Sequence, residues 1–225
     1  MDRRVTEDES IGSQFDRFLL SIEEGKTLGG IRNVEATEIL RRSKETDSGA
    51  HERRLTEYAK ESGCWTDLKN IKDNLKYLGS GAESDVYLDK DGLYVLKVVH
   101  YKASCETPLD FLNNRIALHN TLFPETVYEL LGFTYSYDIG EEGFYFILKQ
   151  PFIDSKKPRP TQEEIDKYMK RKGFLIDDAT CIVGDYAITD LAPRNFVKDN
   201  EGELYCIDPM ILTKAEYLIK YGRRI

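Results

Sequence analysis

Apolar residues at helical spacing dominate the beginning of the chain. Within residues 13–25 they recur at positions i, i+3, i+4 and i+7, which predicts an amphipathic helix. Residues 33–44 show a second, weaker pattern of this kind, residues 43–50 have the composition of a linker, and residues 51–63 predict a helix that ends at a glycine. Because residues 1–50 are highly charged and contain few strand-forming runs, we expect a helical or partly disordered extension there, either a mobile arm or an arm that docks a partner.

Aromatic and β-branched residues replace this pattern further along the chain. Residues 84–99 contain two short strand-like runs around Asp91-Gly92, a dipeptide typical of a tight hairpin turn. Residues 108–123 return to helical periodicity. Two more strand-like runs lie at residues 126–138 and 143–152. We therefore expect a small, mostly antiparallel sheet with one helix.

A second change in composition follows Pro151, where turns become more frequent. Residues 154–160 read as a turn or linker, and residues 161–174 predict a helix that Thr161 caps. Short strands and turns alternate through residues 181–212, and residues 213–222 predict a final helix. The chain is therefore predicted to have an α+β fold in three parts: an extension at 1–50, a helix plus sheet at 51–153, and a smaller lobe at 154–225.

Composition and charge exclude some classes of protein. The chain of 225 residues is 40% hydrophobic and 32% charged, with a formal net charge of −8. An acidic protein has no general attraction to phosphate backbones, so we expect no nucleic-acid partner. No apolar run is long enough to cross a bilayer, and the first ten residues lack the core of a signal peptide, so we expect a cytoplasmic protein with no membrane partner. The cysteines and histidines are scattered, which predicts reduced packing thiols and no zinc site.

The stretch "GSGAESDVY" raises a chemical question. Gly79, Gly81 and Ser84, followed by Val86, fit either a hairpin turn or a loop that covers a phosphate. A dinucleotide-binding loop is excluded, because that motif needs a following helix and here a strand follows. Lys97 lies further along in the apolar run "YVLKVV", where an unpaired ammonium is costly. It either faces solvent on an edge strand or has a counter-charge, for which a phosphate beneath the glycine loop is a natural candidate.

Three polar residues near the end of the chain are a second candidate group. Asp190, Asn195 and Asp208 lie in "TDLAPRNFVKDNEGELYCIDPM", where a hairpin can bring Asn195 and Asp208 together. An amide oxygen and a carboxylate suit Mg²⁺ with phosphate oxygens as further ligands, and Asp190 could orient a hydroxyl and accept its proton. Taken singly, each of these residues also fits ordinary turn chemistry.

The order of these parts resembles that of a protein kinase over about residues 73–210. "DLAPRN" is similar to the D-L-A-x-R-N form of the catalytic loop, and "IDP" stands where that family has D-F-G. "GSGAESDVYL", "HNTLFPETVYELLGF", "KQPF" and "YCIDPM" look like the serine/threonine/tyrosine kinase domain of phage and conjugative-element polyvalent proteins. That narrower resemblance also covers the helix from about His51 and implies an origin in a phage or mobile element.

The resemblance implies a protein-kinase-like fold, with an antiparallel N-lobe sheet carrying one helix and a reduced C-lobe, and it implies ATP and Mg²⁺ as cofactors. It also implies roles for single residues. Asp190 would be the catalytic base, Asn195 and Asp208 the metal ligands, and Lys97 the partner of the ATP α- and β-phosphates. The nucleotide-covering loop would be formed by Gly79, Gly81 and Ser84, the adenine contacts by Val86, Val95 and Val197, and the hinge by residues 148–152 with Gln150 and Phe152.

The sequence also departs from the family pattern. Where kinases have a glutamate on the helix after the lysine strand, this chain offers Asp110, or else Asn113 or Asn114, and we favour Asp110. Ile188-Thr189 replaces the His-Arg before the catalytic aspartate, and few residues follow Asp208, so we expect no activation segment.

The predicted function is therefore an ATP- and Mg²⁺-dependent phosphotransferase acting on a protein hydroxyl, its own included, with the acceptor left open. The departures keep three alternatives open. The chain could be a nucleotide-binding pseudokinase or scaffold module. It could instead be a small-molecule kinase, as in the aminoglycoside-phosphotransferase branch of the same fold, or an enzyme that transfers AMP.

Overall fold

The computed structural model describes residues 31–137, 142–177 and 180–222. The described chain divides after Asp154 into a first unit, residues 31–154, and a second unit, residues 155–222. The helix predicted at residues 13–25 lies outside the described residues. Mixed helices and antiparallel sheets agree with the predicted α+β class. Within the described residues, no helix combines the length and the apolar character that crossing a membrane requires.

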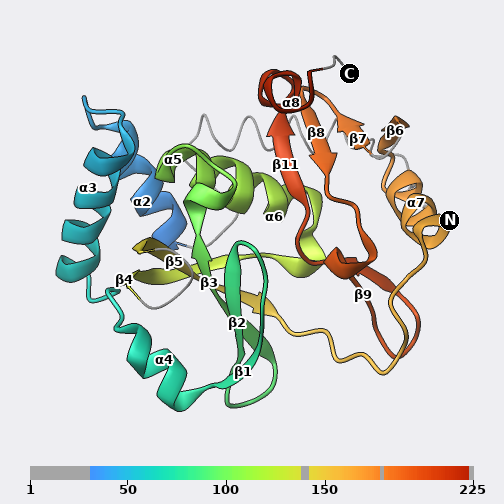
Figure 1. The fold of residues 1–225 in the computed structure, drawn as a ribbon, viewed down its shortest axis with the longest axis horizontal. Helices are drawn as coiled ribbons and strands as arrows, with labels where there is room; N and C mark the ends of the chain where they lie inside the picture. The colour runs from blue at the N-terminus through green and yellow to red at the C-terminus, as the bar shows by residue number, and fades with distance from the viewer. Residues whose placement is uncertain (1–30, 138–141, 178–179, 223–225) are drawn as a thin grey trace, which may run out of the picture. The chain divides into compact units, whose positions relative to one another are not determined.

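The first unit is built on a five-stranded antiparallel sheet with strand order β1-β2-β3-β5-β4 (Figure 1). Its strands are β1 (Lys76–Ser80), β2 (Ser84–Leu88), β3 (Tyr94–His100), β4 (Glu129–Ser136) and β5 (Gly143–Pro151). The predicted turn at Asp91-Gly92 joins β2 to β3, and Gly92 has a φ of 69°, a conformation that glycine adopts without strain. The sequence did not predict β1, which pairs with β2 at the edge of the sheet.

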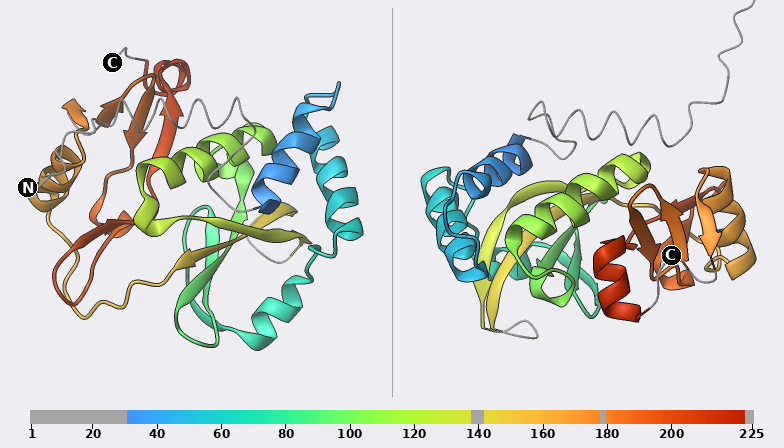
Figure 2. Two further views of the ribbon diagram at one scale, coloured as in Figure 1. Left: turned by 180° about the vertical axis from the view of Figure 1, so that it is seen from behind. Right: turned by 90° about the horizontal axis from the view of Figure 1, so that it is seen from above.

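One long helix covers a face of this sheet, as residues 108–123 predicted (Figure 2). It consists of α5 (Pro108–Asp110), a π-helical stretch η2 (Phe111–Ala117) and α6 (Leu118–Leu122), and is called the central helix below. Phe111, Leu112 and Ile116 from this helix pack with Phe133 and Phe146 of the sheet in the largest core cluster. The central helix is therefore fixed to the sheet by apolar burial, the dominant favourable term in folding.

Two further helices complete the same core. They are α2 (Ile31–Arg41) and α3 (Ser48–Glu61), which pack against each other and against β4. Ala36 and Leu40 of α2 are fully buried in the core cluster, although the sequence placed them in a separate extension. The helix α3 begins before the predicted residue 51 because the Asp47 side chain accepts a hydrogen bond from Ala50 N and caps it.

The opposite face of the sheet is covered by α4 (Leu68–Asn74). Leu68 and Ile71 of α4 are buried against Tyr87, Val98 and Ile147. Short 3₁₀ turns, η1 (Tyr101–Ala103) and η3 (Pro124–Thr126), lead into and out of the central helix region. Because successive strand residues point to opposite faces, Val95, Lys97 and Val99 face the central helix rather than α4.

The second unit contains one four-stranded antiparallel sheet, one hairpin and two helices. The sheet order is β11-β8-β7-β6, and β9 and β10 form the separate hairpin. The strands are β6 (Leu175–Asp177), β7 (Thr180–Val183), β8 (Tyr186–Thr189), β9 (Phe196–Lys198), β10 (Leu204–Cys206) and β11 (Met210–Thr213). The helices are α7 (Gln162–Arg171) and α8 (Lys214–Tyr221), and a 3₁₀ turn, η4 (Pro193–Asn195), leads into β9. Thr161 caps α7 as predicted, and Glu164 completes a capping box.

Candidate functional site

The glycine loop, residues 79–84, connects β1 to β2 in the first unit. Gly81 N donates a hydrogen bond to Ser84 O at 2.8 Å, and His100 N donates to Glu83 O at 2.9 Å. Neither Gly79 nor Gly81 has a positive φ. A Cβ atom at Gly79 would meet nothing within 4 Å, and one at Gly81 would meet only Ser84 O at 3.9 Å. The folded chain therefore does not itself require glycine at either position, and the two glycines leave the loop open to close approach by a ligand.

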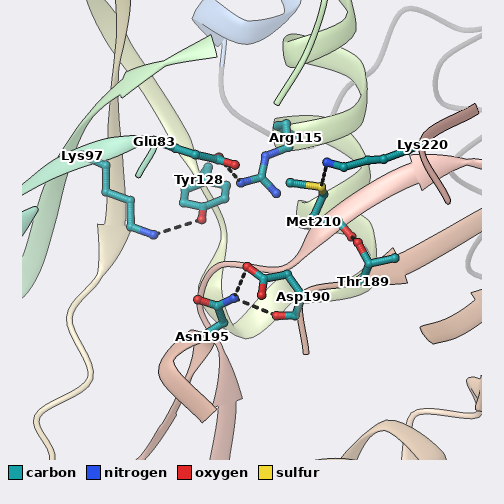
Figure 3. Close-up of polar contacts among 9 residues, drawn as sticks. All are labelled: Glu83, Lys97, Arg115, Tyr128, Thr189, Asp190, Asn195, Met210 and Lys220. Atoms are coloured by element: carbon teal, nitrogen blue, oxygen red, sulfur yellow. Dashed lines mark hydrogen bonds and ion pairs between the residues drawn. The ribbon is translucent and has the colours of Figure 1, made fainter. Parts of the chain in front are cut away.

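Lys97 lies in the middle of β3, on the face covered by the central helix. It pairs with Val86 on β2 and Leu148 on β5, and it is only 6% exposed. Its Nζ donates a hydrogen bond to Tyr128 Oη at 3.1 Å and lies 5.1 Å from the centre of that ring (Figure 3). The solvent-facing alternative for Lys97 is therefore wrong, because this lysine is buried.

Tyr128 is a site residue that the sequence did not reveal. The Asn120 side chain on the central helix holds its backbone: Oδ1 accepts from Tyr128 N at 2.6 Å, and Nδ2 donates to Tyr128 O at 2.8 Å. The ring is also within 4.4 Å of the His119 ring, centre to centre. Tyr128 thus gives Lys97 a hydrogen-bond acceptor that the central helix holds in place. A tyrosine at the start of a strand gives no sequence signal for this role.

Asp110, the predicted acidic partner of Lys97, lies in the first turn of the central helix. Its Oδ2 accepts hydrogen bonds from Thr107 N at 3.1 Å and Thr107 Oγ1 at 2.7 Å, while Asp110 N donates to Thr107 Oγ1. This reciprocal arrangement is a capping box, which satisfies donors at the start of a helix. The structure therefore gives Asp110 a capping role, and its pairing with Lys97 stays a prediction.

A buried ion pair in this unit was also missed. Arg115 Nη2 on the central helix lies 2.9 Å from Glu83 Oε2 in the glycine loop. Both side chains are largely buried, at 9% and 19% exposure. Arg115 is a charged residue inside the otherwise apolar and amide-rich stretch "FLNNRIALHN", so the reasoning applied to Lys97 could have identified it as a residue in need of a counter-charge.

The predicted adenine and hinge residues of the first unit lie near the end of β5. Val95 is paired with Gln150, on the same sheet face as Val86 and Lys97. The Gln150 side chain is buried, and its Nε2 donates to Thr126 O at 2.9 Å, so this side chain holds the turn η3 in place. Phe152 lies two residues before the end of the first unit, and its backbone N donates a hydrogen bond to Leu93 O at 2.9 Å.

The loop between β8 and η4 carries Asp190 in the second unit. Asp190 has a φ of 55° and is the one non-glycine residue with a left-handed backbone among those that the structure describes. Such a conformation is strained for most residues, although aspartate tolerates it better than most, and it is concentrated at functional sites. The Asp190 side chain is 37% exposed, and its Oδ1 accepts a short hydrogen bond from Arg194 Nη2. Asp190 is therefore both held in place and accessible.

Asn195 fixes the conformation of this loop from within. Its Nδ2 donates to Asp190 O at 2.7 Å and to Asp190 Oδ2 at 2.8 Å (Figure 3). Both acceptors need a donor, so the amide nitrogen must face Asp190 and the Oδ1 atom must face elsewhere. Asn195 therefore presents a hard oxygen of the kind that Mg²⁺ prefers.

Two strand ladders place Asp208 beside these residues. On one side, Thr189 of β8 pairs with Met210 of β11. On the other side, β9 pairs with β10, and just beyond this hairpin Ile207 N donates a hydrogen bond to Asn195 O at 2.9 Å. The backbone segments 190–195 and 207–209 are thus held together at both ends, and the convergence of the Asn195 and Asp208 side chains stays a prediction.

The donor set at this loop suits a cation that keeps other ligands. The described residues contain no group of three or more His, Cys, Asp or Glu side chains arranged to hold a metal. One amide oxygen and one carboxylate fit Mg²⁺, which typically keeps waters and phosphate oxygens in its shell.

Val197, the predicted adenine contact of the second unit, lies on β9, opposite Tyr205. Its neighbour Lys198 bonds Glu164 of α7 at 2.7 Å, and this bond lowers the pKa of Glu164 to about 2.

Comparison with known proteins adds one finding. A family model described as a serine/threonine/tyrosine kinase found in polyvalent proteins matches residues 48–215. The matched range includes every site residue predicted from the sequence in both units. No curated protein and no solved structure matches the chain.

Proposed function

Because the chain belongs to the family of serine/threonine/tyrosine kinases found in polyvalent proteins, we propose that it is an ATP- and Mg²⁺-dependent kinase that phosphorylates protein hydroxyls, its own included. The observation that carries this proposal is the loop that two strand ladders hold together, with Asp190, Asn195 and Asp208 on it. The family match supports a kinase-like phosphotransferase, and the loop supports the specific chemistry.

The second unit supplies the groups that act on the acceptor. Asp190 orients the acceptor hydroxyl and takes its proton, while the hydroxyl oxygen bonds to the γ-phosphorus and the bond from that phosphorus to the bridging oxygen of ADP breaks. Asn195 holds Asp190 in its strained conformation through two hydrogen bonds. Asn195 Oδ1 and the Asp208 carboxylate are the proposed Mg²⁺ ligands. The ion, when bound, neutralises charge on the phosphate oxygens.

The first unit supplies the groups that act on the nucleotide. The glycine loop would cover the phosphates, and Lys97 would balance their charge. Two features support these roles: glycines that the fold itself does not need, and a buried lysine on the same sheet face as Val86 and Val95. Catalysis by such an enzyme consists mainly of positioning and charge neutralisation, which fixed side chains of this kind provide.

The test is incubation of the purified protein with Mg²⁺ and γ-labelled ATP, beside Asp190→Asn, followed by intact mass measurement. We expect label and a phosphate mass increase on the wild type alone, with Mg²⁺-ATP still binding to the variant. An AMP mass increase would replace the proposal with nucleotide transfer. If the wild type binds Mg²⁺-ATP but no label appears on this chain, on added proteins or on added small molecules, the pseudokinase alternative is favoured. If the wild type neither becomes labelled nor binds Mg²⁺-ATP, the kinase proposal is refuted.

A metal-dependence experiment tests the second half of the proposal. Asp208→Asn is expected to weaken binding of Mg²⁺-ATP far more than binding of ATP in the presence of a chelator, because only the former uses the carboxylate as a ligand. Lys198→Gln is a matched control, since it removes a charge from the neighbouring hairpin without touching the proposed ligands. Equal losses with and without Mg²⁺ would contradict the ligand assignment.

A further inference from the structure

The Arg115–Glu83 ion pair joins the central helix to the glycine loop within the first unit. The two residues are 32 positions apart in the sequence, and Arg115 Nη2 lies 2.9 Å from Glu83 Oε2 (Figure 3). Arg115 comes from the π-helical stretch η2, a geometry that is rare and is frequently found at functional sites. The pair therefore links the glycine loop directly to the central helix.

The loop has few other attachments. Ser80, Gly81 and Ala82 are exposed, and the Ser80 hydroxyl contacts only the neighbouring Gly81 O, at 3.4 Å. Its two ends are paired in the sheet, Gly79 with Val86 and Ser84 with Val99, and between these ends the backbone makes the Gly81–Ser84 and His100–Glu83 hydrogen bonds. Among the contacts that the structure describes for residues 79–84, Glu83–Arg115 is the side-chain contact that reaches another element. Ordering a loop with two glycines carries a high entropy cost, so this contact matters to its position.

The burial of the pair increases its effect. At 9% exposure the Arg115 guanidinium is little screened by water or salt, and removal of Glu83 would leave a desolvated charge with one partner fewer. In the other direction, removal of Arg115 would leave the Glu83 carboxylate uncompensated in the loop that faces nucleotide phosphates in the proposed function. A carboxylate there would repel the phosphates.

We propose that the Arg115–Glu83 ion pair is a latch that holds the glycine loop on the central helix before nucleotide binds. Arg115 and Glu83 are thus positioning residues, and the latch raises affinity for a nucleoside triphosphate by preordering the loop and by neutralising Glu83. The effect on affinity rests on the proposed function, whereas the effect on loop order does not.

The latch is tested by hydrogen exchange of peptides covering residues 76–88 in the nucleotide-free protein. Arg115→Gln and Glu83→Gln are each expected to raise the exchange rate of the loop about tenfold. A change of this size is within the range expected when the interaction of two coupled charges is lost. The charge-reversed double variant, Glu83→Arg with Arg115→Glu, is expected to restore protection. Lys198→Gln, which breaks a 2.7 Å ion pair of the second unit with a similarly buried cation, should leave the loop unchanged.

Two results would overturn the latch. One is unchanged loop exchange in both single variants. The other is loop exchange in the charge-reversed protein as fast as in the single variants, because a general disturbance of packing would not be repaired by reversing the charges. Peptides from β4 and β5 serve as an internal check, since the latch predicts no change in these strands.

Binding of Mg²⁺-ATP to the same variants tests the consequence for affinity. Arg115→Gln is expected to bind about tenfold more weakly, and the charge-reversed variant is expected to recover. Equal affinity in all variants would overturn the link between latch and nucleotide. If the wild type bound no nucleotide, the proposed function would fail, while the exchange measurements would still decide whether the latch exists.

Discussion

Replacing Gly81 with alanine separates what the fold needs from what a ligand needs. The backbone there has no positive φ, and the new Cβ would meet only Ser84 O, at an ordinary contact distance of 3.9 Å. Gly81→Ala should therefore stabilise the first unit by about 0.4–1 kcal/mol, because alanine reduces the freedom of the unfolded chain. The same Cβ would project from the loop proposed to cover the nucleotide phosphates. Overlap of one methyl group in a tight contact costs about 1–3 kcal/mol, so Mg²⁺-ATP affinity should fall at least several-fold.

Gly132 provides the matched control in the same unit. A Cβ there would lie 2.0 Å from the Cys64 backbone oxygen, which real structures do not allow. The strand would have to move away, at the cost of the bonds from Phe133 N to Cys64 O and from Thr66 N to Phe133 O. Gly132→Ala should therefore lose about 3 kcal/mol or more of stability.

The assay is urea unfolding followed by the fluorescence of Trp65, the single tryptophan, which lies in the first unit beside Phe144. Binding of Mg²⁺-ATP to the folded variants is measured in parallel. Opposite stability changes in the two glycine variants, with weaker nucleotide binding in Gly81→Ala, are the expected pattern. A destabilised Gly81→Ala would show that the fold does need this glycine. Unchanged affinity would show that no ligand approaches the loop closely, and either result would refute the reasoning.

Three further changes test single contacts. Asp110→Asn should destabilise the first unit by about 1 kcal/mol, like Thr107→Ala, if capping is its whole role; a loss of Mg²⁺-ATP affinity in Asp110→Asn alone would instead support pairing with Lys97. Tyr128→Phe removes the hydroxyl that accepts from the buried Lys97 ammonium, so urea unfolding should show a loss of about 1.5–3 kcal/mol. Burial raises the pKa of the Cys181 thiol to about 12 from 9.0, so the stability that this thiol contributes is complete below pH 9 and falls as the pH rises towards 12. The unfolding midpoints of Cys181→Ala and wild type should therefore converge as the pH rises over that range. Midpoints that stay equally far apart at every pH would contradict the raised pKa of Cys181.

Local patterns explain why much of the fold could be predicted. The hairpin at Asp91-Gly92 and the cap at Thr161 depend on residues within a few positions of one another, and both are present as expected. The same holds for the loop of the second unit, where Asn195 contacts Asp190 five positions away. A short hairpin then brings Asp208 back to that loop. Sequence spacing is sufficient for contacts of this kind, because the turn itself sets the geometry.

The helix α2 shows where a hydrophobic pattern fails. Its buried face includes Asn33 and Thr37, which are 0% and 2% exposed and whose side-chain polar atoms have no hydrogen-bond partner among the residues that the structure describes. Burial of polar groups without partners is unfavourable, so a reader of the sequence would place both on the surface. Ala36 and Leu40 nevertheless pack in the core with them. The weak pattern therefore led to the prediction of an extension, although the helix belongs to the first unit.

The site residues that the sequence did not reveal all depend on packing between distant elements. Lys97 and Tyr128 are 31 positions apart, and Glu83 and Arg115 are 32 positions apart. In both cases the sequence shows a charge that needs a partner, but the partner is chosen by how the sheet, the loop and the central helix lie against one another. Asp110 was favoured because the family pattern puts an acid on this helix, whereas the local Thr107 hydroxyl and backbone compete for the same carboxylate. Local capping is available as soon as the helix forms, so a carboxylate in a first turn is weak support for a long-range ion pair unless the capping residue is absent.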